Sequence, residues 1–144
     1  MSLLNSSLQT ALLGSDVSYN AIGKDAFHKA GKRLLKRIAD ELGLIKEQFY
    51  LRSNHGGIAV SGEITLHTDT LYLQLSQGAL FRGATYILYR RCDGRKDYGS
   101  LRHTNHFIEV ARLLDDGVER RFMITLQNIV GVAVTAQTDR RLVA

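Results

Sequence analysis

The densest group of chemically active side chains lies between residues 90 and 106. The binding candidates in this stretch are Arg90, Arg95, Lys96, Asp97 and Tyr98. Guanidinium and ammonium groups bind phosphate oxygens, and an aspartate or histidine beside them could act as an acid or a base. The spacing matches no catalytic motif, so a flexible basic loop remains the alternative. These residues fit an enzyme and a binding protein equally well.

The histidines of the same stretch raise the question of a metal. His103 and His106 are three residues apart, a spacing that places two imidazoles on one face of a helix. No third ligand is signalled, and Thr104-Asn105 between them is typical of a loop or a helix cap. Glycine-rich nucleotide-binding patterns are also absent from the sequence. We therefore predict no metal site and no cofactor.

A second set of polar side chains alternates with aliphatic ones between residues 48 and 77. Successive side chains of a strand point to opposite faces, so the aliphatic residues would line one face of a sheet and the polar ones the other. The binding candidates on the polar face are Tyr50, Arg52, Asn54, Glu63, His67, Tyr72 and Gln74. Tyrosines could stack on nucleic-acid bases while the polar groups contact base edges. An ordinary solvated face, or a pocket for a small molecule, is the alternative.

The clearest helix pattern covers residues 25–42, where apolar residues recur at spacings of three and four. Asp25 is expected to cap its start, and Gly43 to take the left-handed conformation after its last turn. A basic patch lies opposite the apolar stripe and consists of Lys29, Lys32, Arg33, Lys36 and Arg37. This patch either faces solvent or contributes to binding a phosphate-rich partner.

The polar and aliphatic faces need three strands to position them. These are expected at residues 49–53, 58–66 and 70–77. Two-residue hairpin loops at His55-Gly56 and Thr68-Asp69 would join them. The second loop would place Ile64 opposite Leu73, and the aliphatic residues of neighbouring strands then share one face.

The remaining pattern completes a prediction of fold class. A short N-terminal helix is expected to end near Leu12, and a fourth strand over residues 84–92. Residues 106–126 fit either a helix or a hairpin that turns at Asp116-Gly117, and we favour the hairpin. The chain is therefore predicted to be one α+β domain over residues 1–144. Its long amphipathic helix would pack on one face of an antiparallel meander sheet of about five to seven strands.

Composition sets limits on the class of protein. Apolar residues make up 44% and charged residues 23%, values typical of a globular domain. A single cysteine cannot form an internal disulfide, which favours a reducing compartment. The N-terminal stretch resembles neither a secretory signal nor a membrane span, so we expect a cytoplasmic protein without membrane partners. The formal net charge of +5 would attract acidic partners.

Three hypotheses about function follow. The leading one is a small domain that binds nucleic acid, or assists its processing, through the basic patch, the basic stretch and the polar sheet face. The second is a small-molecule-binding or hydrolytic domain with a pocket on the polar face. The third is a homo-oligomeric assembly module without catalysis that pairs through a sheet edge, because the chain has no proline to protect such edges.

Overall fold

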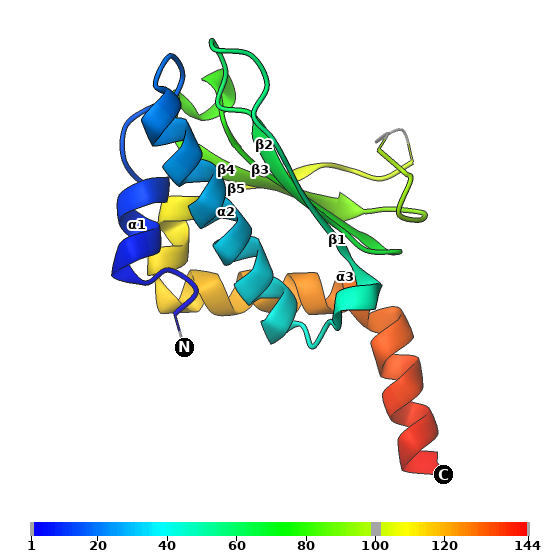
Figure 1. The fold of residues 1–144 in the computed structure, drawn as a ribbon. Coiled ribbons are helices and arrows are strands. Elements are labelled where there is room, and N and C mark those ends of the chain that lie inside the picture. Colours follow the sequence, from blue (N-terminus) through cyan, green and yellow to red (C-terminus); the bar gives the residue numbers. More distant parts are fainter. Residues whose placement is uncertain (1, 99–101, 144) are drawn as a thin grey trace.

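The computed structural model describes residues 2–98 and 102–143, with side chains described up to residue 131. Its helices are α1 (Ser6–Leu12), α2 (Ala21–Glu41) and α3 (Asp116–Val143). Its strands are β1 (Tyr50–Asn54), β2 (Glu63–His67), β3 (Leu71–Gln77), β4 (Thr85–Arg91) and β5 (His106–Glu109) (Figure 1). Three short 3-10 turns are η1 (Lys46–Gln48), η2 (Ala79–Phe81) and η3 (Val110–Leu114). The α+β class is confirmed, and the described sheet has five strands.

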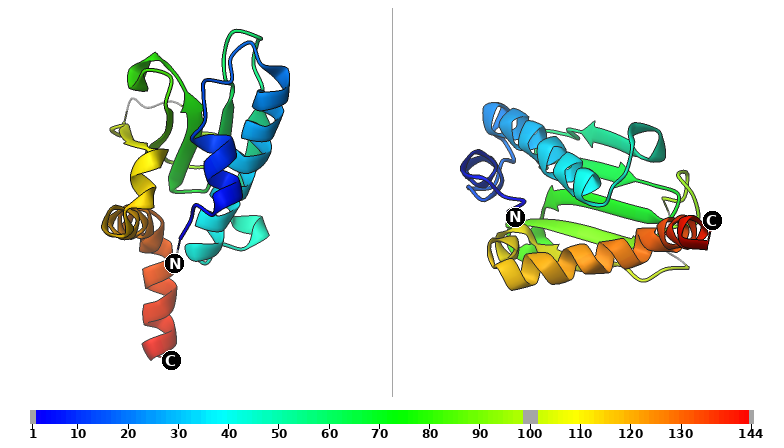
Figure 2. Two further views of the ribbon diagram at one scale, coloured as in Figure 1. Left: turned by 90° about the vertical axis from the view of Figure 1, so that its left-hand side faces the viewer. Right: turned by 90° about the horizontal axis from the view of Figure 1, so that it is seen from below.

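The sheet is a meander in the order β1-β2-β3-β4-β5, with every neighbouring pair antiparallel. Helices α2 and α3 cover one face, and α1 lies beside α2 (Figure 2). On α2, Gly31 allows a close approach, since a Cβ there would lie 2.8 Å from Ile64 Cδ1. On α3, the Phe122 ring packs against Tyr89 of β4 with 5.3 Å between ring centres. The aliphatic core fills the space between this face and the helices.

Helix α2 matches the predicted amphipathic helix but begins four residues earlier. The Asn20 side chain caps it by accepting the Gly23 backbone N–H at 2.9 Å. Asp25, the predicted cap, instead lies within the helix and forms an exposed ion pair with Lys29 at 3.0 Å. The predicted ending is confirmed, because Gly43 adopts a φ of +74° directly after the helix.

The second hairpin keeps the predicted aliphatic face but not the predicted register. Ile64 lies opposite Leu75, not Leu73. The turn is centred one residue further on, because the Thr68 hydroxyl accepts the backbone N–H groups of Thr70 and Leu71 at 3.1 and 2.8 Å. This moves every pair by two residues, which is a full side-chain period, so the same residues still face the core.

The first hairpin differs more strongly from its prediction. Residues 55–62 form a loop, and β2 begins only at Glu63, so Ile58 and Val60 are 73% and 51% exposed and not part of the core. Gly62 ends this loop with a φ of +73°. A Cβ at Gly62 would lie 2.2 Å from the Asn54 carbonyl oxygen, so no other residue fits without a change in the chain path.

The 55–62 loop is fastened to the first half of α2 by two buried side chains. The Lys24 ammonium donates to the carbonyl oxygens of His55 and Gly57 at 3.1 and 2.8 Å. The His28 ring stacks on His55 with 4.0 Å between ring centres.

Hydrogen bonds fix the protonation of the His28 ring. Its Nε2 lies 2.7 Å from the Ser61 carbonyl oxygen, which can only accept, so Nε2 carries the proton. Its Nδ1 is then free to accept the Ser53 hydroxyl, also at 2.7 Å. Burial lowers the pKa of His28, which favours this neutral form.

The predicted hairpin over residues 106–126 is wrong. Only β5 is a strand here, and the chain then passes through η3 into α3. The Asp115 carboxylate accepts the backbone N–H groups of Gly117 and Val118 at 2.9 and 3.1 Å, so Asp116-Gly117 opens a helix and not a turn between strands. Phe122 and Leu126 of α3 then face the core.

The N-terminal helix is confirmed. Asn5 caps α1 by accepting the Leu8 backbone N–H at 2.9 Å, and Leu4, Leu8 and Leu12 are buried. Within the described residues, none of the helices combines the length and the apolar character that a membrane crossing requires.

Candidate nucleic-acid interface

The face of the sheet opposite the helices, which we call the open face, carries polar and aromatic side chains from all five strands. The register sets them in three rows: Tyr50, His67, Tyr72 and Arg90; then Arg52, Thr65, Gln74, Leu88 and Phe107; then Asn54, Glu63, Ser76, Tyr86 and Glu109. All seven candidates predicted between residues 48 and 77 therefore share this face. Arg90 joins them because β4 pairs with β3.

Residues 93–98, which we call the strap, cover three residues of the first row: His67, Tyr72 and Arg90. Arg90 anchors it and is 1% exposed. Its guanidinium donates to the Asp97 carbonyl oxygen at 3.0 Å and lies 3.7 Å from the Asp97 carboxylate. On its other side the guanidinium carbon lies 4.7 Å from the centre of the Tyr72 ring. The basic stretch and the sheet face, separate in the sequence, thus meet at Arg90.

Two titratable side chains are buried beneath the strap. His67 packs against Tyr98 with 5.0 Å between ring centres, and neither ring nitrogen has a hydrogen-bond partner among the described residues. Burial lowers the pKa of His67. Burial also raises the pKa of Tyr72 to about 12, and its hydroxyl donates to Gln74 Oε1 at 2.9 Å. Burial therefore disfavours the charged form of both groups.

Beside these covered residues lies a surface group that we call the arginine–tyrosine cluster: Tyr50, Arg52, Arg95 and Tyr98. Tyr50 is 46% exposed, and the guanidinium carbons of Arg52 and Arg95 lie 5.5 and 4.8 Å from its ring centre. Arg52 also donates to the Tyr98 hydroxyl at 3.0 Å. An ion pair of 3.3 Å to Asp69 in the β2–β3 turn holds Arg95 in place. The cluster combines accessible ring area with two positive charges.

A second aromatic group occupies the β4–β5 side of the open face. The rings of Phe81, Tyr86 and Phe107 lie 4.9 to 6.2 Å apart, and Phe107 is 39% exposed. We call it the three-ring cluster. Sequence reasoning misses it because Phe107 lies in the segment that fits either a helix or a hairpin, and Phe81 lies between two predicted strands. The alternation in residues 85–91 was the available signal, since it places Tyr86 on the same face as Arg90.

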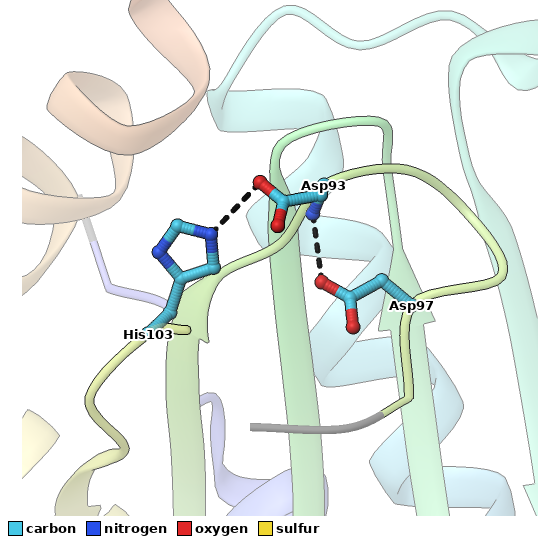
Figure 3. Close-up of side chains that lie close together, drawn as sticks. All are labelled: Asp93, Asp97 and His103. Atoms are coloured by element: carbon cyan, nitrogen blue, oxygen red, sulfur yellow. Dashed lines mark hydrogen bonds and ion pairs between the residues drawn. The ribbon is translucent and has the colours of Figure 1, made fainter. Parts of the chain in front are cut away.

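The strap and the segment before β5 bring together Asp93, Asp97 and His103 (Figure 3). His103 Nε2 lies 2.9 Å from Asp93 Oδ1, and this hydrogen bond lowers the pKa of Asp93. The Asp97 carboxylate accepts the Asp93 backbone N–H at 2.8 Å. One ligand atom from each residue lies within 4.8 Å of the others. The spacing alone would suit a cation.

The charges around these residues oppose that use. Arg90 and Arg102 lie 3.7 and 3.6 Å from the carboxylates of Asp97 and Asp93 and would repel a metal ion. His106 lies in β5 and is not part of the group. The group therefore fits better as the closure of the strap, and the absence of a metal remains a prediction.

The basic patch of α2 does not join this surface. Helix α2 covers one face of the sheet and the open face is the other, so the sheet lies between them (Figure 2). Two of its charges are balanced within the helix, through the Lys29–Asp25 and Lys36–Asp40 pairs. Arg37 donates to the Ser2 carbonyl oxygen. Lys96 of the strap, in contrast, is exposed beside the open face.

Comparison with known proteins gives no assignment for this chain. No family model, no curated protein and no solved structure matches it. The side chains of the open face are therefore the basis for assigning a function.

Proposed function

We propose that the open face binds single-stranded nucleic acid, with the arginine–tyrosine cluster as its main contact. The observation that carries the proposal is an exposed tyrosine ring, Tyr50, flanked by the guanidinium groups of Arg52 and Arg95 on an antiparallel sheet whose opposite face holds the helices. Single-strand-binding sheets use this combination: aromatic rings stack on unpaired bases, and arginines contact the phosphates.

The two aromatic groups suggest the path of the strand. Tyr50 lies on β1 and Phe107 on β5, which are four strand spacings apart, or about 19 Å. A few nucleotides can cross this distance. Gln74 and Thr65 lie between them and offer hydrogen-bonding groups to base edges. Bases in a duplex are stacked on each other and cannot reach the rings, so a single strand is favoured.

The distribution of charge suggests where binding begins. Arg52, Arg95 and Lys96 lie near the β1 end, whereas Glu63 and Glu109 lie in the third row of the open face. Phosphates would be attracted first to the arginine–tyrosine cluster and repelled from the third row. A cytoplasmic location fits this function, because the lone Cys92, buried and donating to the Thr68 carbonyl oxygen at 3.3 Å, stays reduced there.

Fluorescence anisotropy with labelled oligonucleotides tests the proposal directly. A single-stranded pyrimidine oligonucleotide and a duplex of equal length are titrated at about 50 mM and about 200 mM salt. We expect the single strand to bind more tightly than the duplex, with an affinity that falls as salt rises. No single-strand binding at the lower salt concentration would rule the proposal out.

Matched variants locate the surface. Tyr50→Ala should weaken single-strand binding by about 1–3 kcal/mol, since it removes one stacking platform. The control is Lys32→Ala, which removes an exposed charge from the basic patch on α2 and should change the affinity less than about twofold. A loss in Lys32→Ala as large as that in Tyr50→Ala would show that binding is not confined to the open face.

A further inference from the structure

A groove of about 420 Å³ lies on the helix-covered side of the sheet, between α3 and the ends of β4 and β5. Arg91 borders it from β4 and His106 from β5, while Thr125 and Asn128 border it from α3. Arg91 pairs with Leu71 and belongs to the face opposite the open face. The groove and the arginine–tyrosine cluster are therefore separated by the sheet.

Polar, exposed residues line the groove at the edge of this face. Along β4 the helix-facing positions run from Ile87 to Tyr89 and end in Arg91. The part of α3 across from them presents Thr125 and Asn128 to the groove in place of aliphatic side chains. Arg91, Thr125 and Asn128 are all exposed, so a ligand can reach their polar groups from solvent.

The groove is rich in positive charge. Arg91 and Arg102 both border it, and no carboxylate is among its lining residues. Within the described part of the chain, Arg91 forms no ion pair, and the one carboxylate paired with Arg102 is that of Asp93, at 3.6 Å. Arg102 is 83% exposed in that pair and can turn toward a ligand. Arg91 is thus available for an anion, and Arg102 would join it by turning away from Asp93.

One wall of the groove is flat. The rings of Tyr89 and His106 stack with 5.4 Å between their centres and 28° between their planes. Ile129 of α3 adds apolar surface beside them. A ligand with a planar or apolar part could rest against this wall while its anionic group meets the arginines.

We propose that this groove binds the phosphate group of a small molecule about the size of a mononucleotide. Arg91 and Arg102 would contact the phosphate oxygens, since a planar guanidinium fits them in pairs. The Thr104 hydroxyl and the Asn128 amide supply further donors at the rim. The volume falls within the range of about 300–1,000 Å³ that small-molecule sites occupy. This proposal does not depend on the function proposed for the open face.

The test uses the full chain with adenosine monophosphate and adenosine as probes, titrated by calorimetry and by two-dimensional amide NMR. We expect saturable binding of the monophosphate with shifts in the Thr125 and Asn128 signals. Adenosine should bind at least about tenfold more weakly, because it lacks the charged group. No binding of the monophosphate at millimolar concentration, or equal binding of adenosine, would overturn the proposal.

Substitutions separate this groove from other basic surfaces. Arg91→Gln should weaken binding of the monophosphate at least about tenfold. The control is Arg120→Gln on the same helix as Thr125, since Arg120 lines a different groove with Glu41; it should stay within about twofold of the wild type. Tyr50→Ala should leave the affinity for the monophosphate unchanged. Arg91→Gln should leave the affinity for the single-stranded oligonucleotide unchanged. The two proposals can therefore fail separately. Equal losses of affinity for the monophosphate in Arg91→Gln and Arg120→Gln would refute the proposed site. Amide NMR spectra that match the wild type away from the substitution confirm that each variant folds.

Discussion

At the scale of single residues, Gly62 determines how the chain enters β2. Its φ of +73° and the 2.2 Å approach to the Asn54 carbonyl oxygen leave no room for a side chain. We predict that Gly62→Ala lowers the free energy of unfolding by at least about 2 kcal/mol. Gly57→Ala in the same loop is the control, because nothing lies within 4 Å of a Cβ there, and it should change stability by less than about 0.5 kcal/mol. Urea denaturation measures both, and equal effects would contradict the prediction.

Tyr72 gives a residue-scale prediction about alkaline pH. Burial raises its pKa to about 12 in the folded protein, above the ordinary value of 10.0 that it regains on unfolding. The unfolded chain therefore releases this proton first, so the stabilising contribution is complete below about pH 10 and is lost as pH rises toward 12. Tyr72→Phe should reduce the fall in stability over this window, as measured by urea denaturation. A fall of the same size in Tyr50→Phe and Tyr72→Phe would argue against the assignment.

At the scale of elements, α3 depends on one cap. Asp115 accepts two backbone N–H groups of its first turn, so Asp115→Ala should cost about 1 kcal/mol of unfolding free energy. The neighbouring Asp116→Ala keeps the cap and should cost only a few tenths of a kcal/mol, through the lost interaction with the helix dipole. Thermal and urea denaturation measure the difference. Similar costs for both variants would show that the dipole, and not the cap, matters.

The elements that the sequence predicts well are those whose signals are local. Helix α2 and its Gly43 ending follow from periodicity and a single glycine, and the aliphatic face of β2 and β3 follows from alternation. The prediction for residues 106–126 is wrong because Asp116-Gly117 is as typical of a hairpin turn as of a helix start. The Asp115 cap favours the helix. The predicted two-residue turn between β1 and β2 is wrong because the path of this loop depends on residues far apart in the sequence. These include Gly62 and Lys24, which contact the chain at Asn54, His55 and Gly57.

The candidate site divides in the same way. Alternation predicts that Tyr50, Arg52 and Gln74 share a face, since strands need only their own sequence to set this. It cannot predict that the strap closes over His67 and Tyr72, because that closure depends on the contact between Arg90 and Asp97 across the fold. Alternation also cannot show that the basic patch of α2 lies apart from the open face, because that separation depends on how the helix packs on the sheet.

At the scale of the whole molecule, the five-stranded sheet separates two surfaces of different chemistry. The open face offers rings and guanidinium groups, and the helix-covered side carries the groove between α3 and β4–β5. The strands β1 and β5 form the edges of the described sheet. Pairing of two copies of the chain through such an edge stays a prediction. Light scattering at several protein concentrations tests it. A monomeric mass at every concentration would exclude it.

The stacked rings of His28 and His55 make one corner of the molecule sensitive to acid. Burial lowers the pKa of His28, so unfolded chains take up a proton more readily than folded ones. The contribution of neutral His28 to stability is therefore complete at a pH above the ordinary histidine pKa of 6.5, and it is lost as the pH falls below that value. A second positive charge facing Lys24 would drive the rings apart and release residues 55–62 from α2. Hydrogen exchange at about pH 7.5 and about pH 5 should then show the amides of this loop losing protection before those of β3. In His28→Gln the loop should exchange at similar relative rates at both values, and an unchanged acid response in this variant would assign the sensitivity to another group.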